Sequence, residues 1–134
     1  SQVAKNLDMK HVLVVHGDDG LDEISITSET SISELKDMQI KEYKISPTDF
    51  GLDFGTFEAI TAQSSEESLK MVNEAFAGTK SSIQDMIALN AGAALYIANK
   101  VTSINDGVEL AFELMNSGKA AEKLNAYVNA SNNL

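Results

Sequence analysis

The sequence has no cysteine and no arginine, and each absence excludes a class of site. Its 134 residues contain no Cys, no Trp and one Pro, and all ten of its basic residues are Lys. Without Cys there is no disulfide, no thiolate catalysis and no zinc site built on Cys. Without Arg the chain lacks the planar guanidinium fork that suits pyrophosphate and carboxylate groups. With a net charge of −10, the chain is poorly suited to bind anionic ligands by itself.

The acidic balance also argues against nucleic acid and anionic membranes as partners, because both attract clustered Lys or Arg. A hydrophobic content of 43% and a charged content of 22% are ordinary for one soluble domain. The longest apolar stretch, residues 86–98, is interrupted by Asn90 and is too short to span a bilayer. Residues 1–5 have no apolar core of signal-peptide length. We therefore expect a soluble, cytoplasmic protein without nucleic-acid or membrane partners.

The most informative segment is an acidic, glycine-containing turn at residues 16–25, with the sequence HGDDGLDEIS. It follows the apolar run of residues 12–15, which is typical of a strand buried on both faces of a parallel sheet. Ligands of open α/β sheets bind beyond the carboxyl ends of such strands. Carboxylates there suit a hard cation such as Mg²⁺, which usually shares its shell with substrate phosphates. The alternative is a solvated turn without a ligand. The glycines form neither G-x-G-x-x-G nor a Walker spacing, so no phosphate-cradling loop is predicted.

The remaining patterns predict an α/β fold, with a partial parallel sheet, an antiparallel hairpin and covering helices. Residues 1–8 have helical spacing, residues 10–16 form the parallel strand, and residues 24–26 begin a second extended segment. Two further extended segments, residues 32–35 and 40–45, are joined by a short polar connection and predict the hairpin. From Ser64 onward the period is helical. Helix starts are predicted at Ser46, Ser64, Ser81 and Ser103, and a last helix at residues 119–128.

Two further expectations concern the helical half. The helix after Ser81 has apolar residues on two faces, which predicts that it is buried nearly all round. Residues 129–134 lack a pattern and are expected to form a frayed tail.

Several segments together resemble one family, that of anthranilate phosphoribosyltransferase. The segments, in chain order, are HGDDGLDEIS, ISELKDMQIKEYKISPTDFGL, LNAGAALYIA, GVELA and SGKAAEKL. They cover nearly the whole chain and resemble the C-terminal part of that family's α/β domain. The resemblance implies that residues 1–134 are one portion of this domain, without the family's N-terminal helical domain and Gly-rich phosphate loop.

The resemblance implies an activity as well. The family transfers the phosphoribosyl group of phosphoribosyl pyrophosphate to anthranilate, with Mg²⁺, in tryptophan biosynthesis. The positions matching its metal-binding pair are Asp22 and Glu23, and no catalytic or substrate-binding residue is expected in this chain. This portion alone is expected to be inactive and to self-associate, while the parent enzyme is expected to be a homodimer. The alternatives are a non-enzymatic paralogue that binds another ligand or partner, and a nucleoside phosphorylase-like enzyme.

Three other polar residues, two histidines and an asparagine, are expected to have structural roles. His16 is expected to be a hydrogen-bonded structural residue, and His11 to lie at the surface. The amide of Asn90 is expected to tie its helix to a neighbouring loop. In a straight strand Asp22 and Glu23 would point to opposite faces, so they share one ion only if the chain still turns after Gly20.

Three further polar residues lie in the acidic turn itself. Asp18 and Asp19 are expected to bond their own backbone, as Asx residues in turns do. Ser25 has a hydroxyl that could reach the same site, although a Ser facing a helix is the commoner case.

Overall fold

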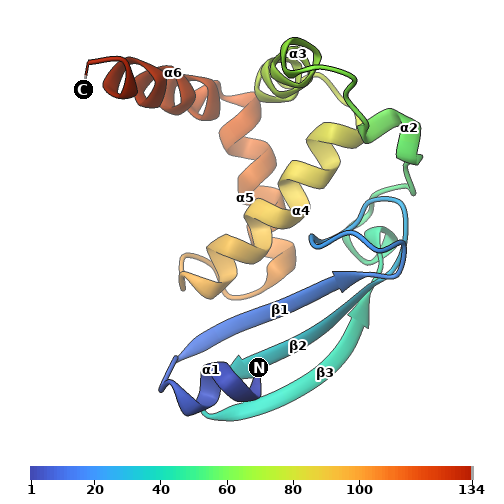
Figure 1. Ribbon diagram of the computed structural model, residues 1–134, viewed down its shortest axis with the longest axis vertical. Coiled ribbons are helices and arrows are strands. Elements are labelled where there is room, and N and C mark those ends of the chain that lie inside the picture. Colours follow the sequence, from blue (N-terminus) through green and yellow to red (C-terminus); the bar gives the residue numbers. More distant parts are fainter. Residues whose placement is uncertain (134) are drawn as a thin grey trace.

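A computed structural model describes residues 1–133, in which three strands form an antiparallel sheet of order β1-β2-β3 (Figure 1). The strands are β1 (His11–Gly17), β2 (Thr30–Lys36) and β3 (Gln39–Ile45). The predicted hairpin is confirmed, because β2 and β3 pair from Thr30↔Ile45 to Lys36↔Gln39. Its two-residue turn, Asp37 and Met38, has φ of 50° and 61°. Positive φ at both positions matches the twist of antiparallel strands.

The α/β class is confirmed, but the expected parallel strand is not found in residues 1–133. β1 pairs antiparallel with β2 along its whole length, from His11↔Lys36 to Gly17↔Thr30. The connection between them, residues 18–29, is a turning loop, whereas a parallel partner needs a long crossover, usually a helix. β1 is not buried on both faces either, since Val14 is 48% exposed.

The expected extended segment at residues 24–26 is buried but is not a strand. Its backbone groups bond to scattered partners instead of a neighbouring strand. The Ser25 N–H donates to Thr30 Oγ1 at 2.9 Å, and the Ile26 carbonyl accepts from the Gly55 N–H at 2.9 Å. Because side chains and a loop satisfy these groups, the segment is ordered without pairing in the sheet.

The four helix starts predicted at serines, Ser46, Ser64, Ser81 and Ser103, are confirmed. A short α1 (Gln2–Asn6) precedes the sheet, and η1 (Pro47–Phe50), capped by Ser46, and α2 (Phe57–Ile60) follow it. The long helices are α3 (Ser65–Phe76), α4 (Ser82–Ile97) and α5 (Ile104–Asn116). Each has an N-cap serine whose hydroxyl accepts from the backbone three residues on: Ser64, Ser81 and Ser103. These hydroxyls satisfy donors that the first turn leaves free.

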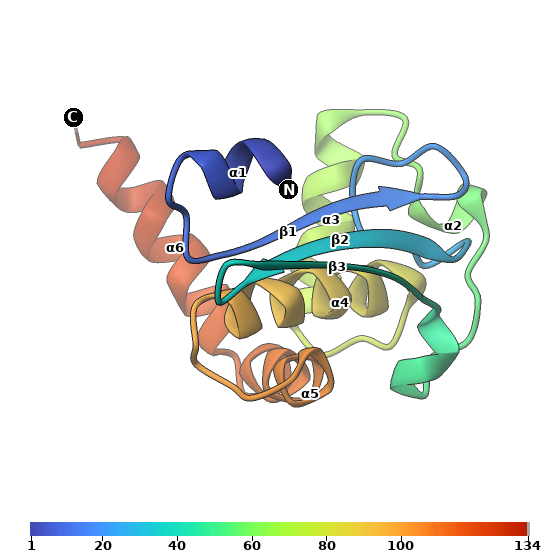
Figure 2. The same ribbon diagram turned by 90° about the horizontal axis from the view of Figure 1, so that it is seen from below.

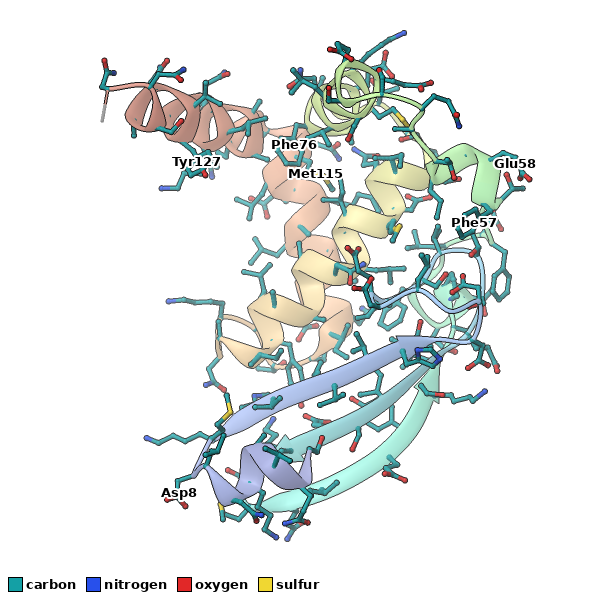
Figure 3. All side chains as sticks on the ribbon, in the orientation of Figure 1. Asp8, Phe57, Glu58, Phe76, Met115 and Tyr127 are labelled. Atoms are coloured by element: carbon teal, nitrogen blue, oxygen red, sulfur yellow. The ribbon has the colours of Figure 1, made fainter. Side chains whose placement is uncertain are left out.

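The last helix, α6 (Lys119–Ser131), is longer than expected, since part of the predicted tail is helical. It has no buried residue, and Tyr127, labelled on this helix in Figure 3, is 70% exposed. Once a helix has formed, each further residue adds one backbone bond, so the helix can continue for a few residues beyond the last patterned position. Leu134 lies outside the described residues.

The core lies between the sheet, α4 and α5. In Figure 2, α1 lies on one side of the sheet, α4 on the other, and α5 beyond α4. The buried cluster consists of Ile24, Ile26, Ala88, Leu89, Ala93, Val108, Ala111 and Met115. Phe76, at the end of α3, packs against this cluster (Figure 3). α4 is buried toward the sheet and α5 but is not covered all round, because Ala94 is exposed. No helix within residues 1–133 is long and apolar enough to cross a membrane.

The crossing of α4 and α5 depends on two glycines that let the backbones touch. A Cβ built on Gly92 would lie 2.6 Å from the backbone nitrogen of Val108. A Cβ built on Gly107 would lie 2.8 Å from the carbonyl carbon of Gly92 and 2.9 Å from its Cα, and closer still to its oxygen. Only residues without a side chain allow so close an approach.

Candidate metal-binding loop

The loop of residues 18–29 joins β1 to β2 and is built around a tight turn. The Gly17 N–H donates to the Leu21 carbonyl and the Gly20 N–H donates to the Gly17 carbonyl, both at 2.9 Å. Gly20 has φ of +93°, which glycine adopts without steric cost. The chain continues to bend at Asp22 and Glu23. The condition under which both carboxylates could serve one ion, a chain still turning after Gly20, is therefore met.

Asp18 and Asp19 are occupied by other partners. The Lys44 ammonium donates to Asp18 Oδ2 at 2.5 Å, which ties the loop to β3. Asp19 Oδ1 accepts from the Leu21 N–H at 3.1 Å, as expected of an Asx turn. Asp19 Oδ2 accepts from the Ser25 hydroxyl at 2.5 Å and from the Thr27 hydroxyl.

These contacts explain the acidity of Asp19. Burial by itself would raise the pKa of its carboxyl, but the hydrogen bonds that it accepts outweigh burial and lower the pKa from 3.8 to about 2. Asp19 therefore remains charged at neutral pH and organises the turn from within. The Ser25 hydroxyl is directed to Asp19, so it reaches the acidic turn, which was the less common of the two expected arrangements.

Asp22 and Glu23 differ from their two neighbours. Both are exposed, and within residues 1–133 neither side chain accepts a hydrogen bond or forms an ion pair. The described residues contain no group of three or more His, Cys, Asp or Glu side chains placed to hold a metal. Two free carboxylates do fit Mg²⁺, which is commonly held by one or two protein carboxylates together with waters and substrate phosphates. They do not fit a cation that needs a complete cage of protein ligands.

The tie predicted for Asn90 is confirmed. Its Oδ1 accepts from the Ile24 N–H at 3.0 Å, and its Nδ2 donates to the Ile24 carbonyl at 2.9 Å. The residue that follows Glu23 is thus joined directly to α4. Glu23 and Asn90 also share the lining of an open apolar cavity of about 390 Å³ with Val72, Ile83, Met86, Ile87 and Ala91.

The two histidines lie opposite to expectation. His16 is exposed at the end of β1, while the side chain of His11 is only 7% exposed and its Nε2 lies 3.0 Å from Glu34 Oε1. His11 is buried because it lies on the sheet face that packs toward α4, where Tyr96 meets its ring edge-on at 4.7 Å.

Sequence reasoning missed the network around Glu34. Besides His11, the carboxylate accepts from the Tyr96 hydroxyl at 2.8 Å and the Tyr43 hydroxyl at 3.0 Å. Burial would raise the pKa of Glu34, but these donors lower it below 4.5. Burial and the nearby Glu34 charge raise the pKa of Tyr43. One signal was available: Glu34 occupies the same strand face as Ile32, where a charge needs partners.

Comparison with known proteins agrees with this architecture. The model of the glycosyl transferase family, a/b domain, matches residues 1–121. The chain belongs to this family of glycosyl transferases. Among curated proteins, anthranilate phosphoribosyltransferase of Vesicomyosocius okutanii is 42% identical over 98% of the chain, and that of Leptothrix cholodnii is 46% identical over 95%. The chain spans 39% and 37% of their lengths, respectively.

Solved structures show the same fold. Anthranilate phosphoribosyltransferase from Thermus thermophilus is 34% identical, with a TM-score of 0.80 over 89% of this chain and 35% of its own. The Saccharomyces cerevisiae enzyme in complex with PRPP and Mg is 21% identical, with a TM-score of 0.82 over 94% of this chain and 36% of its own. At that identity the yeast structure supports the fold alone.

Proposed function

We propose that the protein to which this chain belongs transfers the phosphoribosyl group of phosphoribosyl pyrophosphate to anthranilate, in tryptophan biosynthesis in the cytoplasm. Residues 1–134 are the C-terminal portion of its α/β domain. The family membership and the anthranilate phosphoribosyltransferases that match nearly the whole chain support this proposal. The other parts of the enzyme would supply the phosphate loop and the basic residues, because this chain has no Arg and no glycine-rich phosphate motif.

Within this reaction we assign Asp22 and Glu23 to Mg²⁺. When bound, the metal would neutralise negative charge on the departing pyrophosphate. The two carboxylates supply oxygen ligands and take no part in proton transfer. One observation carries the assignment: of the four carboxylates in residues 18–23, Asp18 and Asp19 are engaged, whereas Asp22 and Glu23 are exposed and unpaired among the described residues.

The activity is tested in the full-length protein with phosphoribosyl pyrophosphate, Mg²⁺ and anthranilate, by following the loss of anthranilate fluorescence and the release of pyrophosphate. The proposal expects both signals to proceed together. Phosphorolysis of nucleosides without either signal would indicate a phosphorylase-like enzyme. No turnover in either assay, by a folded protein, would indicate the non-enzymatic paralogue.

The metal assignment is tested with the double variant Asp22→Ala/Glu23→Ala. Both residues lie in an exposed bend, so the fold should be retained. We expect turnover to fall at limiting Mg²⁺ and the Mg²⁺ concentration for half-maximal rate to rise. The double variant Glu113→Ala/Glu122→Ala removes the same charge from exposed helix positions and serves as the control. Unchanged Mg²⁺ dependence in the first variant would show that residues 22–23 are a solvated turn and would refute the metal assignment.

A further inference from the structure

We infer that Asn90 is a positioning residue for the Asp22 and Glu23 carboxylates: its side-chain amide holds the loop next to them in place before any metal arrives. The inference rests on the proposed function, because it assigns Asn90 a purpose at that same site. It concerns a residue on another element, 66 positions along the chain from Ile24.

The first observation is the geometry of the amide. Asn90 bonds both the N–H and the carbonyl of Ile24, at 3.0 and 2.9 Å, as the backbone of a neighbouring strand would. Its Nδ2 also donates to the Met86 carbonyl at 3.0 Å, one turn earlier on α4. The two bonds to Ile24 determine the orientation of the amide, because the flipped amide would set its NH₂ group against the Ile24 N–H, and the bond to Met86 agrees with that orientation. The loop is therefore joined to α4 in one way.

The second observation is that the other side of the pair is fixed as well. Leu21 donates its N–H to Asp19 and its carbonyl accepts from Gly17, so the backbone is bonded on both sides of that residue. Asp22 and Glu23 form the two-residue span between this anchor and Ile24. Ile24 itself is 2% exposed, and its side chain belongs to the core. The carboxylates are exposed, while the backbone on each side of them is tied down.

The third observation is that α4 is a firm support. Beyond Asn90, the same helix is joined to the sheet at Tyr96, whose hydroxyl bonds Glu34. Leu89, next to Asn90, is fully buried. The helix is thus held on both sides of Asn90.

The anchored backbone matters because the site offers Mg²⁺ few protein ligands. Two carboxylates are few ligands for Mg²⁺, which gives up its waters reluctantly. If the loop had to become ordered when the metal bound, the entropy of ordering would be lost at that step and would weaken binding. With Leu21 and Ile24 already anchored, that ordering is complete beforehand. Groups that orient metal ligands typically change metal affinity about 10–100-fold when removed. Asn90 acts through the backbone, so we expect the lower end, about tenfold.

The test compares Asn90→Ala with wild type in the full-length protein, using Mn²⁺ with inorganic pyrophosphate as the probe. Free Mn²⁺ is measured by electron paramagnetic resonance well below the melting temperature of the variant, against a protein-free titration that corrects for Mn²⁺ bound by pyrophosphate in solution. We expect affinity to fall about tenfold and the Mg²⁺ concentration for half-maximal turnover to rise, while the rate at saturating Mg²⁺ stays near wild type. Asn73→Ala, which removes an exposed asparagine from α3, should change none of these.

Two outcomes separate this inference from the proposed function. If Asp22→Ala/Glu23→Ala weakens Mn²⁺ binding but a folded Asn90→Ala variant does not, only the positioning role is overturned. If neither variant changes Mn²⁺ binding, the assignment of Asp22 and Glu23 to the metal fails together with the positioning role, while the proposed transferase activity is decided by the turnover assay.

A measurement on the wild type covers the case in which Asn90→Ala does not fold. The Ile24 amide should be protected from hydrogen exchange without metal, and metal with pyrophosphate should add little. Free exchange of that amide until the metal is added would overturn the inference.

Discussion

Alanine at the α4–α5 crossing should destabilise the protein even though alanine is the better helix former. In a helix interior Gly→Ala gains about 1 kcal/mol from propensity. At Gly92 the new methyl group would lie 2.6 Å from the Val108 backbone nitrogen and 2.8 Å from Val108 Cγ2. The nitrogen belongs to the α5 backbone, so the contact can be relieved only by moving the helices apart, by roughly 1 Å if a contact of ordinary length is to be restored.

The cost of that movement sets the expected magnitude. Overpacking a close-packed interior typically costs about 1–3 kcal/mol, and here it also loosens Val108 and Ala111, which are buried in the same cluster. Taking the upper end of that range, about 3 kcal/mol, because the close contact is with backbone, and subtracting the propensity gain of about 1 kcal/mol, we expect Gly92→Ala to lower the free energy of unfolding by about 2 kcal/mol. For a chain of this length that corresponds to a Tm lower by roughly 6–8 °C.

The assay is thermal and urea unfolding of Gly92→Ala, Gly107→Ala and the double variant. Ala94→Gly, at an exposed position of the same helix, measures the propensity effect alone and should cost about 1 kcal/mol. Both glycines belong to one contact, so the double variant should lose less than the sum of the single losses. A Tm that is unchanged or higher in both single variants would refute the close-approach argument.

Three further predictions follow from the composition, the Glu34 network and the sheet edge. The 134-residue chain alone should not convert phosphoribosyl pyrophosphate and anthranilate, since it has no phosphate loop and no Arg; measurable turnover by the purified chain would contradict this. Glu34→Gln should be less stable at pH 7. The folded pKa of Glu34 is lowered, so the ionised carboxylate stabilises the fold above the unfolded pKa of about 4.3, and this stabilisation is lost as pH falls through the folded pKa. The difference in urea midpoint between wild type and Glu34→Gln should therefore narrow on acidification. A difference that stays constant with pH would disprove this linkage. The chain should also self-associate through the edge strand β1, where Val14 is 48% exposed, and Val14→Lys should reduce this in sedimentation experiments; a monomeric wild-type chain at high concentration would count against it.

Local signals predicted much of the fold. Serine caps, the turn before β3 and the helical period depend on residues a few positions apart, and the structure agrees with them at Ser64, Ser81 and Ser103. A parallel pairing was predicted for β1, whereas in residues 1–133 it pairs antiparallel with β2; an apolar run fits either pairing equally well. Which pairing forms depends on the path of the whole chain, here on the loop of residues 18–29.

In the candidate site, too, features with a local sequence signal could be predicted, and features that depend on distant residues could not. The turn at Gly20 and the amide tie of Asn90 could be predicted, because a glycine among carboxylates and a lone polar residue on an apolar helix each suggest a local purpose. The Glu34 network could not, since Tyr96 lies 62 residues away and only the folded chain brings its hydroxyl to the carboxylate. His11 was assigned to the surface for the same reason.

The turn between β2 and β3 is a position where the stability of the protein could be increased. Met38 adopts a left-handed backbone with φ of 61° and is 49% exposed, so its side chain gains little from packing while its backbone occupies a region that glycine enters freely. β2 starts at the acidic loop and ends at this turn, which places the two at opposite ends of the strand. A more heat-resistant form of the protein could therefore begin with glycine at position 38, leaving the surroundings of Asp22 and Glu23 as they are.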